Sequence, residues 1–310
     1  MIEILPFDKK MTDDWEAVIT SVRSGNFLYS RRYIDYHGDK FHDKSLLVRK
    51  NNKVIAAFPA AMVGNDVISH PGITFGGLIS TSSLHGEEAL LVMKNIKDHY
   101  KEEGAEQLIY KALPFIFYDY PCQEDLYALN VMGATLFRRD LSSVIKMSTK
   151  KKFSKGRVWS INKSIKLGVK ITETLELKQF YRLLLEVLKN HNVIPTHSLL
   201  ELQDLFTRFP KNICLFGAVI NNEMLAGAIV YDYGDVVHTQ YLASSDEGKK
   251  MGCLDHLISY LINDRYNDKK YFSFGISTED GGKILNNGLI SFKESFGARG
   301  ITNDFYRLNF

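Results

Sequence analysis

Three short apolar runs in the second half of the chain predict an antiparallel β-meander. The runs cover residues 214–220, 225–231 and 236–243, and they are separated by Asn-Asn at 221–222 and by Tyr-Gly-Asp at 233–235. Asparagine, aspartate and glycine are turn signals at such points, because they tolerate the left-handed backbone that tight hairpins require. We therefore expect three consecutive strands joined by hairpin turns.

The hydrophobic period changes after residue 249. Apolar residues now recur every three or four positions, which is the spacing of a helix with one buried face. A further apolar run at residues 271–276 predicts a strand after this helix. The expected buried positions of the helix are Leu254, Leu257, Ile258, Leu261 and Ile262.

The first half of the chain repeats this order of elements. Strand patterns at residues 45–50, 54–63 and 66–69 precede a helix pattern at 86–103 and a strand pattern at 107–112. Several residues also recur at one constant offset, and the two signals together indicate an internal duplication. The residues that recur 170 positions later are Asn51, Asn52, Ala56, Gly64 and Val67, which match Asn221, Asn222, Ala226, Gly234 and Val237.

Helical spacing and charge complete the outline of the chain. Helices are predicted at residues 11–24, 26–36, 176–190 and 199–208, and the first should end near Arg23. The most basic stretch, residues 148–170, is interrupted by apolar residues, so one side of it can pack while Lys155, Arg157 and Lys163 face outward. We expect an N-terminal domain over residues 1–147, a basic linker helix over 148–170 and a C-terminal domain over 171–310.

Composition places the chain among ordinary globular proteins. It has 310 residues, of which 45% are hydrophobic and 24% charged, and its net charge of +3 is too small to argue for nucleic acid. Three distant cysteines indicate reduced thiols, without a disulfide framework or a zinc site. No signal peptide and no apolar run of about 20 residues is present, so we expect a cytoplasmic protein that does not associate with a membrane.

The junction between the third strand of the meander and its helix, residues 244–253, is a candidate anion site. Small residues let the backbone approach a ligand, while helix N-terminal N–H groups and two lysines favour a pyrophosphate. The alternative is an ordinary helix start in which Ser245 or Asp246 caps and the lysines are solvated.

This order of meander, glycine-containing turn, helix and strand resembles the GNAT superfamily of acyl-CoA-dependent N-acyltransferases. Residues 247–252 occupy the register of the family's Q/R-x-x-G-x-G/A turn, which holds the coenzyme A pyrophosphate. The segment NNGLISFKESFGA at 286–298 resembles the closing helix of these proteins, and it also resembles the gLixFKexFGa signature of FemABX-like transferases. Residues 154–168 are similar to the basic stretch that precedes the second half of FemABX-like proteins.

The resemblance implies an α/β (α+β) fold with two GNAT-like domains, each a mixed, mainly antiparallel sheet flanked by helices. It also implies a coenzyme A thioester as co-substrate. The first half has a rigid loop at residues 70–77 in place of the basic turn, so we expect only the second half to bind the coenzyme. The expected coenzyme contacts are Leu242, Ala243, Glu247, Gly248, Lys249, Lys250, Met251, Gly252, Cys253, Asn287 and Phe292.

The first half is then free to shape the acceptor pocket. The candidate bases are His238, Glu279 and Asp280, with proton transfer through water or the substrate's own phosphate left open, and a backbone N–H near Leu242 or Ala243 is the expected oxyanion donor. No metal is expected, since no carboxylate or cysteine accompanies the two histidines at 191 and 197. The expected acceptor contacts are Arg32, Tyr36, His70, Arg157, Lys163, His191, His197, Tyr241 and Lys293.

The leading hypothesis from the resemblance is an N-acyltransferase of surface-polysaccharide (O-antigen) biosynthesis. It would move an acyl group from acyl-CoA to the amine of a dTDP-type nucleotide-linked amino sugar, with no nucleic acid partner. One alternative is a FemABX-like aminoacyltransferase that takes its acyl group from aminoacyl-tRNA. Another is a GNAT-like binding module without catalysis. The acyl group, the sugar and the oligomeric state, a homodimer included, stay open.

Overall fold

The computed structural model describes residues 1–22, 26–189 and 193–310, and the chain forms two compact units. The first unit contains Met1–Leu141, Glu279–Ile284 and Thr302–Phe310, and the second contains Ser142–Thr278 and Leu285–Ile301. This division differs from the contiguous ranges expected from the sequence, because the chain passes between the units more than once. The segment expected to be a linker belongs to the second unit.

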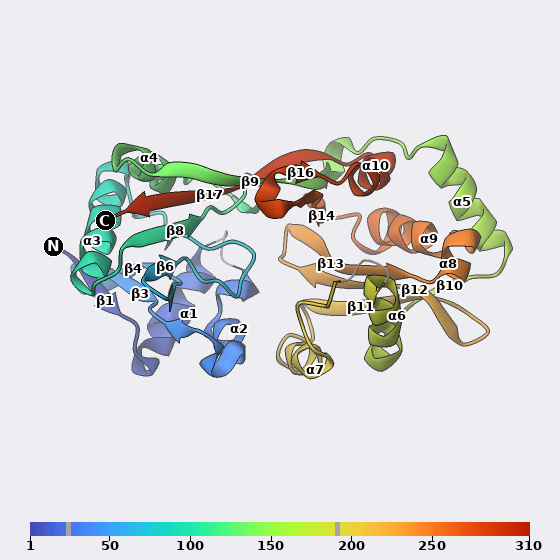
Figure 1. Cartoon of the computed structure of the whole chain (residues 1–310), viewed down its shortest axis with the longest axis horizontal. Helices are drawn as coiled ribbons and strands as arrows, with labels where there is room; N and C mark the ends of the chain where they lie inside the picture. Colours follow the sequence, from blue (N-terminus) through green and yellow to red (C-terminus); the bar gives the residue numbers. More distant parts are fainter. Residues whose placement is uncertain (23–25, 190–192) are drawn as a thin grey trace. The chain divides into compact units, whose positions relative to one another are not determined.

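The described residues of the first unit form two groups of strands and four α-helices. Figure 1 shows how these elements are arranged. Four strands pair in the order β1-β3-β4-β7, namely Ile2–Pro6, Leu46–Lys50, Lys53–Phe58 and Ile79–Ser80. Five others follow the order β17-β8-β6-β5-β2, namely Arg299–Asn309, Gln107–Lys111, Asp66–Ile68, Ala61–Val63 and His42–Asp43. The helices are α1 (Thr12–Ser21), α2 (Arg31–Ile34), α3 (Gly86–Glu102) and α4 (Glu124–Val131).

The second unit is built on six strands in the order β10-β11-β12-β13-β14-β9. All neighbours are antiparallel except β13 and β14, which are parallel. The strands are Lys170–Thr174, Ile213–Ile220, Glu223–Asp232, Val236–Ser244, Tyr271–Ile276 and Thr135–Lys146. The helices are α5 (Lys155–Lys166), α6 (Leu177–Lys189), α7 (Leu199–Arg208), α8 (Asp246–Met251), α9 (Cys253–Tyr260) and α10 (Asn287–Ser295).

Short elements complete the described structure. One turn of π-helix, Leu261–Arg265, extends α9, and β15 (Thr278–Glu279) pairs with β16 (Ile284–Leu285). The 3₁₀ turns are Lys9–Met11, Phe27–Tyr29, Asp35–Lys40, Phe115–Phe117, Met147–Thr149 and Asp280–Gly282. In the described parts of the chain, no helix is both long and apolar enough to cross a membrane.

The internal duplication is visible in the backbone. Asn51 and Asn52 have φ of +49° and +64°, and Asn221 and Asn222 have φ of +50° and +64°. A register shift follows Val48 in β3, and another follows Ala218 in β11, again 170 residues later. The two halves thus repeat the same hairpin and the same bulge, as the sequence predicts.

The last strand of each half pairs with the sheet of the other unit. Residues 142–146 of β9 lie antiparallel to β14, whereas residues 305–309 of β17 lie antiparallel to β8. The two halves of the sequence, which resemble one another, therefore exchange equivalent strands. The sequence analysis did not predict β9 or β17, because the charged residues in both interrupt a simple alternation of apolar and polar positions.

Several predicted elements differ from the structure in their limits. The helix expected over residues 26–36 is instead a 3₁₀ turn, the short helix α2 and a second 3₁₀ turn. The single helix expected after residue 249 is two helices, because Gly252 has φ of +73° and ends α8. The strand expected over 54–63 divides into β4 and β5 around Pro59, which cannot donate to a ladder. The first helix ends at Ser21, before the expected Arg23, which lies outside the described residues together with Asn190 at the end of the 176–190 prediction.

Both units have apolar interiors that fix these elements. In the second unit, residues of β11, β12 and β14 pack against α9 and α10. Its core includes Phe216, Val230, Leu257, Phe272 and Phe296, all fully buried. In the first unit the corresponding core includes Phe58, Val92, Tyr100, Leu108 and Tyr110.

Candidate functional site

The sheet of the second unit opens between β13 and β14. Their parallel pairing covers only residues 236–238 and 271–273, and beyond this point β13 continues to Ser244 paired with β12 alone. A bulge marks the same place, since Ile229 opposes Tyr241 and Val230 opposes Thr239, which leaves Gln240 without a register partner. Leu242 and Ala243, near which an oxyanion donor is expected, lie on this open part of β13.

His238 and Ser273 face one another at the last paired position before the opening. Their side chains are joined by a contact of 3.0 Å between His238 Nδ1 and Ser273 Oγ. Gly275 makes room for the imidazole, because a Cβ at this position would lie 2.9 Å from His238 Cε1. Burial, together with the charge of Lys293, lowers the pKa of His238 to about 4. The ring is therefore neutral at physiological pH.

Lys293 of α10 reaches the same opening. The residue is only 3% exposed, and its Nζ donates to the carbonyls of Gly275 and Ile276 at 2.9 and 2.6 Å. An ammonium group has three donors, and these two bonds leave one. Burial lowers the pKa of Lys293 to about 7. The structure thus brings together His238 and Lys293, two of the residues selected from the sequence.

His197 and Tyr241, both expected to contact the acceptor, also meet. His197 Nδ1 lies 2.7 Å from Tyr241 Oη, and the His197 backbone N–H donates to the same oxygen at 3.2 Å. Tyr181 donates its hydroxyl to the His197 carbonyl at 3.3 Å. This cluster ties the segment before α7 to β13, close in sequence to His238. The third expected histidine, His191, lies outside the described residues.

The turn expected to hold a pyrophosphate begins as a capped helix. Ser245 Oγ accepts the N–H of Gly248 at 3.0 Å, so the alternative of a serine cap is the one observed. Asp246 and Glu247 occupy the first turn, and Lys249 is paired with Asp246 at 2.9 Å. Two carboxylates stabilise the helix start, but they oppose the approach of a phosphate.

The glycines of this turn are required by packing inside the protein. A Cβ on Gly248 would lie 2.4 Å from the carbonyl of Leu225 in β12, and one on Gly252 would lie 2.4 Å from Ser160 Oγ in α5. Lys163 of α5 donates to the carbonyl of Lys250 at 2.7 Å. Helix α5 thus packs directly on the end of α8.

Several other predicted contacts are occupied internally. Cys253 is fully buried in the core and Met251 packs against it, so the side chains of both are occupied within the protein, and a coenzyme contact by these residues stays a prediction. Lys250 is exposed, and Asn287 is exposed at the start of α10. Phe292 is partly buried beneath the guanidinium of Arg157, at 4.6 Å from its ring centre.

Arg157 does not face outward, contrary to the expectation for the basic stretch. Its Nη1 donates to both carboxylate oxygens of Asp255 at 2.8 and 2.9 Å, and its Nε donates to Ser295 Oγ at 2.7 Å. Asp255 is buried on α9, and Arg157 supplies its positive partner. Arg157 therefore joins α5, α9 and α10. The interruption of the basic run by apolar residues predicts a packed side but does not identify which cation turns inward.

The remaining candidates belong to the first unit. Glu279 and Asp280 are exposed beside a 3₁₀ turn, Arg32 is exposed on α2, and Tyr36 packs on His37 with ring centres 4.0 Å apart. His70 is buried with φ of +46°, its Nδ1 accepts the N–H of Gly72 at 3.2 Å, and burial lowers its pKa to about 3. This histidine shapes a loop and is neutral.

Ser273 and Gly275 were missed by the sequence analysis. Their signal was a serine inside the apolar run 271–276 and a glycine near its end, which indicates a close approach of another group. The register that sets Ser273 against His238 could not be read from the sequence. Among the residues that the structure describes, no group of three or more His, Cys, Asp or Glu side chains is placed to hold a metal.

Two cavities lie elsewhere. One of about 640 Å³ in the first unit is lined by α1, β3 and the 81–83 loop, and one of about 350 Å³ in the second unit is lined by β10, α7 and β11. Neither is lined by a residue selected from the sequence.

The fold and the open strand pair define a tandem GNAT-like protein. The sequence matches no protein-family profile and no curated protein. Among solved structures, it is similar to FemX at 12% identity, with a TM-score of 0.72 over 99% of this chain and 97% of that one. L-PGS from Bacillus licheniformis gives 16% identity and a TM-score of 0.65 over 98% and 93% of the chains. A tandem GNAT protein from the clavulanic acid biosynthesis pathway gives 13% identity and 0.53, over 100% and 98%.

Proposed function

We propose that this protein is an acyltransferase that moves an activated acyl group onto an amine at the opening between β13 and β14. The observation that carries the proposal is the convergence of a neutral histidine and a buried lysine on Gly275, where the strands part. One group accepts a proton and the other supplies a positive charge, and acyl transfer to an amine needs both.

In the proposed reaction the amine attacks the acyl carbonyl and forms a carbon–nitrogen bond. His238 Nδ1 is engaged with Ser273, so Nε2 accepts the proton that the amine loses. The charge of Lys293 stabilises the oxyanion of the tetrahedral intermediate, as does a backbone N–H of the open part of β13. The carbon–oxygen or carbon–sulfur bond of the donor then breaks, and the leaving group takes up a proton.

The favoured donor is an aminoacyl ester carried by tRNA, because the α8 turn is poorly suited to a coenzyme pyrophosphate. Asp246 and Glu247 lie at the helix start, and Lys249 is neutralised by Asp246. This choice reverses the sequence-based order of hypotheses and the expectation of no nucleic acid partner. Acyl-CoA, with a nucleotide-linked amino sugar as acceptor, is the second candidate. It is favoured by the fold shared with the tandem GNAT protein, whose structure is described as being without AcCoA.

A direct comparison of donors tests this proposal. Purified protein is incubated with either radiolabelled acetyl-CoA or tRNA charged with a mixture of labelled amino acids, together with a panel of soluble amines that includes dTDP- and UDP-linked amino sugars. We expect amine-dependent transfer of label from charged tRNA. Transfer from acetyl-CoA alone would establish the second candidate, and transfer from neither donor would contradict an acyltransferase.

His238→Asn should lower kcat by about 100-fold with little change in KM, because asparagine cannot accept the proton. The pKa of His238 is lowered to about 4, so on the acid side of the pH–rate profile the wild type should lose activity as pH falls towards 4. His256→Asn is the matched control, since His256 is also a partly buried histidine of the second unit, beside Ser164. Equal effects of the two substitutions on kcat would remove His238 from the mechanism.

A further inference from the structure

The region around α5 carries an unusual concentration of positive charge. Residues 141–172 contain eight Lys, one Arg and no Asp or Glu. The rest of the chain has 30 basic and 36 acidic residues and so carries a net charge of −6. The modest total charge of the protein therefore conceals a strongly basic segment within an otherwise acidic chain.

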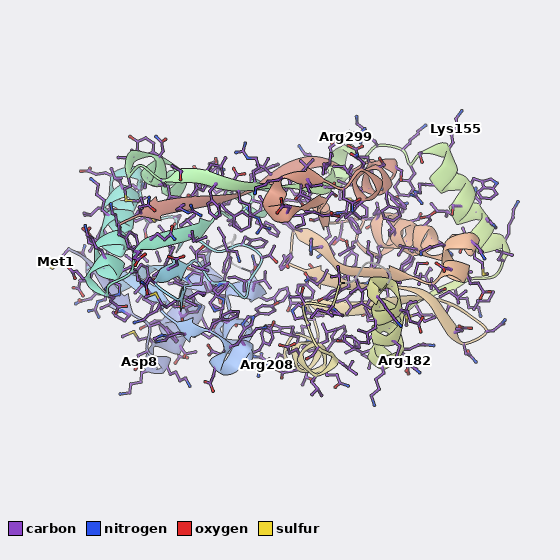
Figure 2. All side chains as sticks on the ribbon, viewed as in Figure 1. Met1, Asp8, Lys155, Arg182, Arg208 and Arg299 are labelled. Carbon is purple, nitrogen blue, oxygen red and sulfur yellow. The ribbon has the colours of Figure 1, made fainter. Side chains whose placement is uncertain are left out.

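Helix α5 has one packed side and one outer side. Ile161 and Ser164 are buried on the packed side, where Arg157 and Lys163 bind α9 and the end of α8. Residues spaced three, four and seven positions apart share a helix face, and this spacing defines the outer face of α5. That face comprises Lys155, Val158, Trp159, Asn162, Ile165 and Lys166, all of them exposed. Figure 2 shows Lys155 at the start of this helix.

Large apolar side chains on this face are left in water. Trp159 is 66% exposed and Ile165 is 52% exposed, and Val158 and the following Leu167 are each 45% exposed. A purely solvated face would carry polar residues here, as the basic composition of the segment suggests. Exposed apolar residues in a contiguous group indicate a contact surface.

Among the residues that the structure describes, the lysines beside these apolar residues have no anionic partner. Lys151, Lys152, Lys155 and Lys166 are exposed and form no ion pair with any described carboxylate. Lys163 differs from these lysines, because its Nζ donates a hydrogen bond to the carbonyl of Lys250. The same Nζ lies 5.3 Å from the centre of the Trp159 ring. Of the four exposed lysines, Lys155 and Lys166 lie on the same face of α5 as the apolar residues.

We propose that the outer face of α5 docks on an anionic phospholipid bilayer. Lysines of an amphipathic helix bind lipid phosphates, while tryptophan and aliphatic side chains enter the boundary between headgroups and acyl chains. RNA would use the lysines and the tryptophan, but it would leave Val158, Ile165 and Leu167 exposed to water. The proposal adds a membrane surface to the acyl-transfer function and does not depend on the identity of the acyl donor.

Vesicle binding by the full-length protein tests the inference. Vesicles of phosphatidylcholine with 30% phosphatidylglycerol are compared with pure phosphatidylcholine, by co-sedimentation and by tryptophan fluorescence. The chain has two tryptophans, and Trp15 is fully buried, so a blue shift on addition of vesicles reports Trp159. We expect binding and a blue shift only with the anionic vesicles, and both should weaken as salt is raised. No binding, or equal binding to both vesicles, overturns the proposal.

Paired variants locate the docking face. Lys155→Glu with Lys166→Glu should lower the vesicle partition constant at least about tenfold, because each lysine near an anionic surface contributes roughly fivefold. Lys94→Glu with Lys101→Glu makes the same change in net charge on exposed positions of α3 and should have little effect. Trp159→Phe should abolish the blue shift. Equal loss in both double variants overturns the assignment to α5, as does loss of binding to uncharged tRNA without loss of binding to vesicles.

Discussion

Replacing Lys293 by methionine should reduce acyl transfer at least about 100-fold at neutral pH, mainly through kcat. Methionine preserves the length and the apolar contacts of the side chain but removes the charge that stabilises the developing oxyanion. The pKa of Lys293 is lowered to about 7, so the wild-type rate should fall as pH rises through 7 and the lysine is neutralised. The ratio of wild-type to variant rate should fall over the same interval. Steady-state kinetics from pH 5 to 9 measure both effects.

A purely structural role of Lys293 gives a different result. The carbonyls of Gly275 and Ile276 lose their donor in the variant, and this would lower stability without creating a pH-dependent rate ratio. Lys178→Met, on an exposed position of α6, is the matched control for rate and for unfolding. Folded Lys293 loses its proton at lower pH than the unfolded form, so this group makes the free energy of unfolding rise between about pH 7 and 10. That slope should be reduced in Lys293→Met.

Arg157→Leu should lower the free energy of unfolding by about 3 kcal/mol, because it leaves the buried Asp255 carboxylate without its positive partner. The loss of the Ser295 hydrogen bond and of the guanidinium over Phe292 acts in the same direction. Urea unfolding at pH 7 measures the change. Adding Asp255→Leu should restore much of the loss, since the uncompensated charge is then removed.

Arg139→Leu provides the comparison. Its guanidinium also binds a carboxylate at two points, Asp304 at 2.7 and 2.8 Å, but the arginine side chain is 52% exposed. Such a pair contributes at most about 1 kcal/mol, because water screens it. Similar destabilisation by the two substitutions would show that the Arg157 network is no more important than a surface ion pair.

The regular parts of the fold follow from local patterns. A short stretch of sequence is enough to predict some elements, because its hydrophobic period or its turn residues identify them. These elements are the meander over β11 to β13, the closing helix α10 and the repeated Asn-Asn turns. The break at Gly252 could not be read in this way, because its cause is the Ser160 backbone and side chain in a helix about 90 residues away. The strands β9 and β17 were missed for a similar reason, since their partners are set by the exchange between units.

The sequence predicted which residues belong to the candidate site, but it did not predict all of the contacts between them. His238, Lys293, His197 and Tyr241 were all selected from the sequence, yet only the register of β13 and β14 reveals Ser273 beside the histidine. Burial also changes their chemistry, because it moves the pKa of His238 away from neutrality and brings that of Lys293 towards it. The turn at residues 247–252 shows that matching glycines do not by themselves establish a coenzyme site. Its glycines are present, but they accommodate Leu225 and Ser160.

The exchanged strands constrain the order in which the chain folds during synthesis. Residues 107–111 leave the ribosome almost 200 residues before their partners at 305–309, so the first unit completes its sheet only after nearly the whole chain has been made. The edge of β8 is unpaired on that side during this time, and an unpaired edge invites association with other strands. The second unit receives its borrowed strand early, because β9 precedes β14 in the chain. The second unit, whose residues end at Ile301, is therefore complete before the first unit, which still needs Thr302–Phe310.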